Sequence, residues 1–141
     1  MIFTIDPRIA SSSFFVGDLS LSSLYLKNDA NFPWLILVPR VAEAREIMTL
    51  SPSQQYQLMD EITLVSQALQ QHSTPDKLNV GALGNIVEQL HIHIIGRYQN
   101  DLLWPHSVWQ AGLASLDYQE AKLQEMLHFF HNRLIFLPTA Q

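Results

Sequence analysis

The sequence predicts an α+β fold built on an antiparallel sheet. Short apolar stretches of strand length are separated by turn-forming residues, and two longer segments carry apolar residues at helical spacing. The order is strands, helix, strands, helix, without the regular strand–helix alternation of a parallel sheet. With 141 residues, the chain has the size of a single domain, residues 1–141, with a buried core.

The first half of the chain contains three candidate strands. Residues 14–16 are apolar and precede a turn at Gly17 and Asp18. Residues 21–27 mix apolar side chains with serines, and residues 28–31 form a polar turn cluster. Residues 32–38 are almost continuously apolar, as in a buried strand that Pro39 ends.

A long helix is expected from residue 52 to about His72. Ser51 suits the N-cap, Pro52 the first helical position and Gln54 the capping-box position. One apolar face follows at three- and four-residue steps, formed by Tyr56, Met59, Ile62, Val65 and Leu69.

The second half begins with a candidate strand at residues 79–83 and a bend at Gly84 and Asn85. Residues 87–96 are the next expected strand, and residues 100–112 have no clear period and are interpreted as an irregular loop. Asp117, with Glu120 three residues later, is expected to cap a second helix. The apolar face of that helix would consist of Ala121, Leu123, Met126, Leu127, Phe130 and Leu134.

The composition excludes several kinds of partner and of chemistry. The formal net charge is −5 and no Lys/Arg cluster is present, so a nucleic acid duplex is not an expected partner. Charged residues make up only 15 %, which favours an apolar surface covered by a second copy of the chain. Cysteine is absent, which excludes disulfides and thiolate chemistry. Without a signal-like start or a membrane-length apolar stretch, we expect a cytoplasmic protein that does not bind a membrane.

Residues 89–95 combine strand alternation with histidines. Side chains of a strand point alternately to opposite faces, so Leu90, Ile92 and Ile94 share one face. The other face carries Gln89, His91 and His93, and a strand is rigid enough to hold a catalytic group. The pair alone also fits two histidines at a surface or interface, and this alternative stays open.

Residues 79–85 followed by residues 89–97 resemble the signature region of the histidine-triad family. That signature is His-φ-His-φ-His-φ-φ, with φ apolar, after a loop bearing Asn, Gly and Gln. Residues 32–39 resemble the family's core strand ending in proline, and residues 50–52 the start of its helix. Residues 101–109 resemble a bacterial branch with Trp-Pro and Val-Trp. The first triad position is Gln89 instead of His, and Trp34 stands where many members carry a further His.

The resemblance covers about residues 14–97 and implies a five-stranded antiparallel half-barrel crossed by one long helix. A C-terminal loop and helix would occupy about residues 98–141. Two subunits would form a homodimer with one continuous sheet.

The resemblance also implies attack by a neutral imidazole on the α-phosphate of a purine nucleotide ester, anhydride or phosphoramidate. His91, the middle histidine, would be the nucleophile and form a covalent nucleotidyl-histidine. Phosphate contacts would come from the backbone near Gly81 and Gly84, which allow close approach, and from the side chains of His93, Gln89, Asn79 and Asn85. The nucleoside cleft would be lined by Asn28, Phe14 and Leu26.

Other interpretations fit some of these residues. Asn79 suits a turn, the glycines suit backbone conformation alone, and Trp104 and Trp109 suit packing. His128 and His131 are one helical turn apart but lack a third ligand. The mechanism that the resemblance implies needs no metal, so no metal or other cofactor is predicted.

Two alternative functions remain. One is a module that binds purine nucleotides with little turnover, because Gln89 replaces a histidine. The other is a metal protein that uses His91, His93 and a third ligand.

Overall fold

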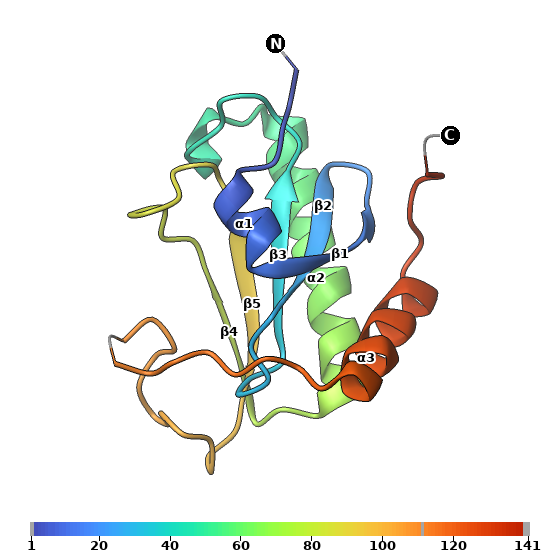
Figure 1. Ribbon diagram of the computed structural model, residues 1–141. Helices are drawn as coiled ribbons and strands as arrows, with labels where there is room; N and C mark the ends of the chain where they lie inside the picture. Colours follow the sequence, from blue (N-terminus) through green and yellow to red (C-terminus); the bar gives the residue numbers. More distant parts are fainter. Residues whose placement is uncertain (1, 111, 140–141) are drawn as a thin grey trace.

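The computed structural model describes residues 2–110 and 112–139 and confirms the α+β prediction (Figure 1). Five antiparallel strands form one sheet in the order β1-β2-β3-β5-β4. Their bounds are Ser13–Asp18 for β1, Ser22–Lys27 for β2, Trp34–Pro39 for β3, Lys77–Gly81 for β4 and Ile92–Arg97 for β5. The α-helices of the described part are α1 (Pro7–Ser11), α2 (Pro52–Ser73) and α3 (Glu120–Arg133), and a 3₁₀ turn covers Ile47–Thr49.

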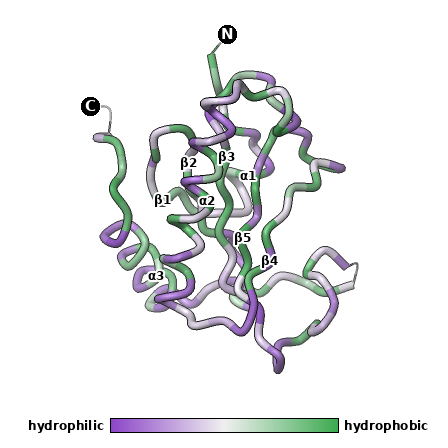
Figure 2. The backbone as a smooth tube through the Cα atoms, turned by 180° about the vertical axis from the view of Figure 1, so that it is seen from behind, coloured by the Kyte–Doolittle hydropathy of each residue, from purple (hydrophilic) through white to green (hydrophobic). Residues whose placement is uncertain are grey.

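The two faces of the sheet carry different apolar clusters. The register pairs Leu26 with Leu35 and Leu35 with Ile94, and this face packs against α2 and α3. The opposite face carries Trp34 and Ile36, and α1 lies in front of it, on the other side of the sheet from α2 (Figure 1). The hydrophobic colouring of β3 and β5 in Figure 2 agrees with strands buried on both faces.

The long helix is confirmed with its capping box. Ser51 Oγ accepts from the Gln54 backbone N–H, and the Gln54 side chain accepts from the Ser51 N–H. The predicted apolar face is partly wrong, because Tyr56 and Met59 are 76 % and 60 % exposed. The face that packs on the sheet consists of Leu58, Glu61, Val65, Ala68 and Leu69.

Glu61 explains the difference in the helix face. Its buried carboxylate accepts the backbone N–H groups of Leu21 at 2.8 Å and Ser22 at 3.0 Å. The carboxylate therefore caps the start of β2, and an apolar pattern alone does not include it in the core.

The C-terminal helix begins later than expected. Asp117 does not cap it, because its carboxylate accepts from Asn28 Nδ2 at 3.1 Å. The N-cap residue is Gln119, which makes no side-chain capping bond. Leu123, Met126 and Phe130 are buried as predicted.

Three further boundaries differ from the sequence prediction. Gly17 and Asp18 belong to β1, where the register shifts between Phe15 and Gly17, instead of forming a turn. The strand expected at residues 87–96 is formed only by Ile92–Arg97. The short helix α1 was not predicted. Among the described residues, no helix has the length and apolar character needed to span a membrane.

Candidate functional site

His91 lies immediately before β5, and the main chain fixes the orientation of its ring. Its Nδ1 is 2.7 Å from the carbonyl oxygen of Gln89. A carbonyl oxygen can only accept a hydrogen bond, so Nδ1 donates and carries the proton. The Nε2 of the neutral ring therefore keeps its lone pair. This is the tautomer that nucleophilic attack through Nε2 requires.

His93 has the opposite tautomer, because Trp34 of the neighbouring strand binds it. The Trp34 indole donates from Nε1 to His93 Nδ1 at 2.9 Å. An indole N–H can only donate, so Nδ1 is the acceptor and the neutral ring carries its proton on Nε2. Burial lowers the pKa of His93 to about 3, and the nearby His91 and Lys27 act in the same direction. At neutral pH His93 is therefore an uncharged donor.

The two histidines line a cavity of about 460 Å³, within the size range of small-molecule sites. The His91 and His93 rings pack edge to face with centroids 4.8 Å apart, and Trp109 contacts His93 at 5.3 Å. Trp34 and residues 83–87 complete the walls. The cavity thus combines aromatic surfaces with two imidazoles of fixed and different tautomers.

Lys27 supplies a positive charge to this cavity. Its ammonium lies 5.8 Å from the centroid of the Trp34 ring, and burial lowers the pKa of the amine. A cation beside an apolar wall favours an anionic ligand, since the surroundings screen its charge less than water does.

A second cavity of about 250 Å³ adjoins His91. Leu83, Gly84 and His91 line both this cavity and the larger one. Gly84 has φ +79°, a left-handed conformation that favours glycine. Residues 83–91, which we call the wall segment, therefore run between the two cavities and end at His91.

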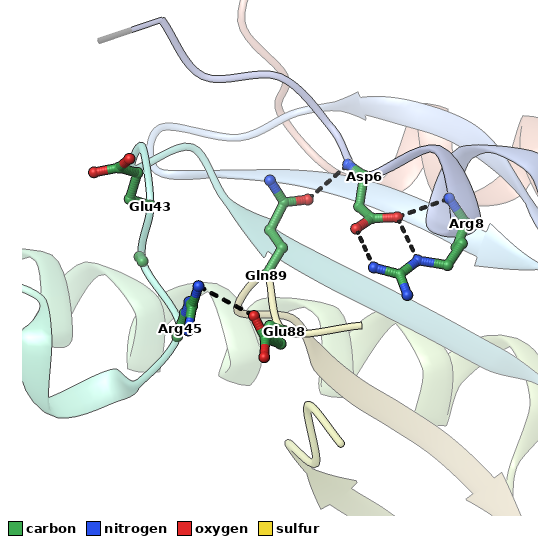
Figure 3. A pocket seen from close by; sticks show the side chains of 7 residues that line it. Asp6, Arg8, Glu43, Arg45, Glu88 and Gln89 are labelled. Atoms are coloured by element: carbon green, nitrogen blue, oxygen red, sulfur yellow. Dashed lines mark hydrogen bonds and ion pairs between the residues drawn. The ribbon is translucent and has the colours of Figure 1, made fainter. Parts of the chain in front are cut away.

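Gln89 contacts the N-terminal part of the chain (Figure 3). Its Oε1 accepts the Asp6 backbone N–H at 2.8 Å, and its Nε2 donates to the Thr4 carbonyl at 2.8 Å. It lines a third, polar cavity of about 500 Å³ together with the ion pairs Arg8–Asp6 and Arg45–Glu88. The predicted phosphate contact through the Gln89 amide is thus replaced by contacts with the backbone of Thr4 and Asp6.

Asn79 lies on the histidine face but belongs to a different cluster. Arg97, only 1 % exposed, donates to Asn79 Oδ1 at 3.1 Å and forms a two-point ion pair with Asp101. Although burial alone raises the pKa of Asp101, the Arg97 guanidinium and three backbone N–H groups hold it below its usual range. Asn79 is not among the residues that line the histidine cavity. Asn85, in contrast, does line it, and its contact with phosphate stays a prediction.

The predicted nucleoside contacts are not brought to the histidines. Leu26 is 0 % exposed, and Phe14 is its cross-strand partner, so both lie on the face covered by the helices. This corrects the expectation that they line the cleft, because cross-strand partners share a face and His93 is on the opposite one. Asn28 binds Asp117 and the Tyr118 backbone and so connects the end of β2 to the C-terminal segment.

Sequence reasoning did not assign Lys27 to the site, and it named Trp34 only as the residue at the position where many members carry a further His. The alternation of side chains along each strand bears on both residues, because it places Lys27 on the opposite face from Leu26 and Trp34 on the opposite face from Leu35. What the pattern could not supply was the pairing of β3 with β5, which places Trp34 beside His93. Trp109 was assigned to packing, and it does pack, but against the ring of His93.

The other histidines lie elsewhere. His72 pairs with Glu125 at 2.9 Å, and His131 Nδ1 contacts the Val16 carbonyl at 3.1 Å. His128 accepts from Asn132 on the same helix. Within the described ranges, no group of three or more His, Cys, Asp and Glu side chains has the arrangement of a metal site.

These features define a protein with two histidines of fixed tautomers at one cavity of an antiparallel sheet, and the comparisons with known proteins identify the family. Residues 9–100 match the model of the HIT domain, so the chain belongs to the histidine-triad family. Members of this family generally bind nucleotides and act as hydrolases or transferases.

Three solved structures are similar over nearly their whole length. A histidine triad protein from Bradyrhizobium japonicum is 41 % identical with a TM-score of 0.91, covering 94 % of this chain and 98 % of that one. One from Sinorhizobium meliloti is 38 % identical (TM-score 0.89, 94 % and 97 % covered). One from Marinobacter aquaeolei is 37 % identical (TM-score 0.91, 95 % and 97 % covered). The comparison with curated proteins found no match.

Proposed function

We propose that the protein is a nucleotidyl hydrolase or transferase that acts on the α-phosphate of purine nucleotide conjugates through a covalent nucleotidyl-histidine at His91. One observation carries the proposal: the Gln89 carbonyl holds the proton of His91 on Nδ1, which leaves Nε2 with a lone pair at a cavity of suitable size. Family membership supports the reaction class.

The reaction would proceed in two displacements at phosphorus. His91 Nε2 attacks the α-phosphorus, the N–P bond forms, and the bond to the leaving group breaks. The leaving group keeps that electron pair and takes a proton from water. A water oxygen then attacks phosphorus, the P–N bond breaks, its electron pair returns to Nε2, and the proton of the water is released. An acceptor other than water in the second step makes the protein a transferase.

Negative charge grows on the phosphate oxygens in both steps, and donors aimed at them stabilise it. His93 offers its Nε2–H without needing a positive charge. Asn85 and the backbone near Gly84 line the same cavity, and Lys27 adds a cation. The Asn79 and Gln89 side chains are engaged elsewhere, so we leave them out of the phosphate site.

The purine would lie against the indoles of Trp34 and Trp109, which offer flat apolar surfaces in the cavity. A binding module with little turnover is the second candidate. The observation that favours it is that both ends of the Gln89 amide are hydrogen-bonded to the backbone of Thr4 and Asp6, so this side chain does not serve the phosphate.

Hydrolysis of adenosine 5′-phosphoramidate at neutral pH without metal tests the proposal. We expect turnover by the wild type, none by His91→Ala, and wild-type turnover by His128→Ala, a control on the exposed side of α3. Mass spectrometry of the quenched wild-type reaction should detect a nucleotidyl group on His91. Binding of the nucleotide without turnover would support the binding module instead, and turnover by His91→Ala would refute the nucleophile assignment.

The homodimer and the cytoplasmic location remain predictions. Within the described sheet, β4 is an edge strand paired only with β5. An exposed edge of this kind can pair with a second chain. Sedimentation velocity of the purified protein would measure the oligomeric state.

A further inference from the structure

The N-terminal segment, which we define as residues 3–9, covers the histidine face of the sheet (Figure 1). Phe3, Ile5 and Ile9 pack into the same apolar cluster as Trp34 and Ile36. Trp109 of the histidine cavity belongs to this cluster as well. Apolar side chains therefore anchor this segment on the sheet, close to the residues that contact His93.

Polar groups of the same segment hold the wall segment at two places. Arg8 Nη1 donates to the Ile86 carbonyl at 2.9 Å. Three residues later in the wall segment, the Gln89 amide is fixed by both of its ends, with Oε1 on the Asp6 N–H and Nε2 on the Thr4 carbonyl. Figure 3 shows Gln89 reaching from the wall segment to the backbone of Asp6.

Gln89 is also the residue whose carbonyl determines the tautomer of His91. Its side chain and its carbonyl are joined to the same Cα, so hydrogen bonds that fix both ends of the amide also limit the movement of the backbone at residue 89. The wall segment has no strand partner at this point, because β5 begins only at Ile92. The Gln89–Leu90 peptide is instead held from two sides: the Leu90 N–H donates to the Ala44 carbonyl at 2.9 Å, and the Gln89 side chain binds the N-terminal segment. The second restraint is the one that depends on the side chain at residue 89.

We propose that Gln89, tethered to the backbone of Thr4 and Asp6, is a positioning residue for His91. The tether keeps the Gln89 carbonyl within hydrogen-bond distance of His91 Nδ1, so the proton stays on that nitrogen and Nε2 stays free. The effect on turnover rests on the proposed function, whereas the effect on the ring tautomer does not.

The substitution Gln89→Met tests this inference, because it keeps the length of the side chain and removes both hydrogen bonds. We expect kcat for adenosine 5′-phosphoramidate to fall by about tenfold, as it does when only about one His91 ring in ten keeps its proton on Nδ1, with little change in KM. In ¹⁵N NMR spectra of the ring, the wild type should show protonated Nδ1, and the variant a mixture of both tautomers. The matched control is Gln55→Met, which removes a local bond to the Leu50 carbonyl on α2.

A second pair of variants tests the same tether by changing its partner in the N-terminal segment, Asp6. Asp6 has φ −60°, which proline accepts, so Asp6→Pro removes the N–H that binds Gln89 without demanding a new backbone conformation. Asp6→Ala keeps this N–H and, like the proline variant, loses the cap and the ion pair with Arg8. The inference requires that the proline variant have a lower kcat than the alanine variant. It also requires that the His91 ring be a mixture of tautomers in the proline variant and a single tautomer in the alanine variant.

Two results would overturn the inference. The first is a wild-type ring spectrum for His91 in Gln89→Met, and the second is identical behaviour of the two Asp6 variants. Absence of turnover in the wild type would count against the proposed function alone, and the ring spectra of these variants would then decide the positioning role by themselves.

Discussion

Replacing Trp34 with phenylalanine should raise the pKa of His93, because the indole N–H stabilises only the neutral ring. The donor lies 2.9 Å from His93 Nδ1, and a protonated Nδ1 cannot accept that bond. A net hydrogen bond contributes roughly 0.5–1.5 kcal/mol, and one pKa unit corresponds to about 1.4 kcal/mol. The pKa should therefore rise by about one unit from its value of about 3.

The control for this prediction is Trp109→Phe. Trp109 packs on the same His93 ring with centroids 5.3 Å apart, yet among the described residues nothing accepts from its buried Nε1. Both variants remove comparable ring area beside His93, and only Trp34→Phe removes a hydrogen bond. The buried acceptor left behind by Trp34→Phe should also lower the free energy of unfolding by about 1–3 kcal/mol more than a ring truncation alone.

Titration of the His93 ring by NMR in the two variants measures the effect, and urea denaturation measures the stability. Equal pKa values for His93 in the two variants would refute the reasoning, because burial by an aromatic ring would then account for the shift without the hydrogen bond.

Three further predictions concern stability. Asp101→Asn should lower the free energy of unfolding by about 3–5 kcal/mol in urea denaturation, because it leaves the buried Arg97 guanidinium without its carboxylate. Glu61→Gln should cost about 1.5–3 kcal/mol in the same assay, because the amide NH₂ faces a backbone N–H where a carboxylate oxygen accepted. His93 binds a proton in the unfolded chain below pH 6.5 but in the folded protein only near pH 3, so it makes stability fall with decreasing pH between these values. His93→Gln should therefore lose stability less steeply than the wild type, by up to about 1.4 kcal/mol per pH unit.

Two of these predictions have a control variant, and the third has an outcome that would contradict it. Asp76→Asn changes an exposed carboxylate that accepts one backbone N–H, and a loss as large as that of Asp101→Asn would contradict the buried ion pair as the cause. Asp60→Asn makes the same carboxylate-to-amide change on the exposed side of α2, and it should leave stability nearly unchanged. For the pH dependence, parallel curves of wild type and His93→Gln between pH 6.5 and 4 would contradict the low pKa of His93.

The sequence predicted the elements whose pattern is local. The capping residues of α2 are adjacent in the chain, and the alternation of β5 is visible in its own residues. The errors arose where a partner distant in the chain decides the outcome. Glu61 is charged and so was excluded from the helix face, but two backbone N–H groups near residue 21 make its burial favourable.

The residues of the candidate site divide in the same way, into those predicted from a local pattern and those that depend on partners distant in the chain. His91, His93 and Asn85 come from one stretch of chain and do line one cavity. Trp34 and Lys27 enter from other strands through the register of the sheet. Phe14 and Leu26 were assigned to the wrong face, because a sequence does not reveal which face of a strand the helices cover.

The glutamine at the first triad position is compatible with a nucleophilic histidine for a reason that lies in the main chain. The group that sets the tautomer of His91 is the carbonyl of residue 89, which every amino acid possesses. A change of side chain at this position therefore leaves the chemical identity of the acceptor intact and alters only how it is held. In this chain the peptide after residue 89 is held by the Leu90 N–H bond to the Ala44 carbonyl, and the side chain of residue 89 is held by backbone atoms of Thr4 and Asp6. The N-terminal segment must therefore be placed correctly by its apolar side chains Phe3, Ile5 and Ile9, and substitutions at these residues should weaken the tether.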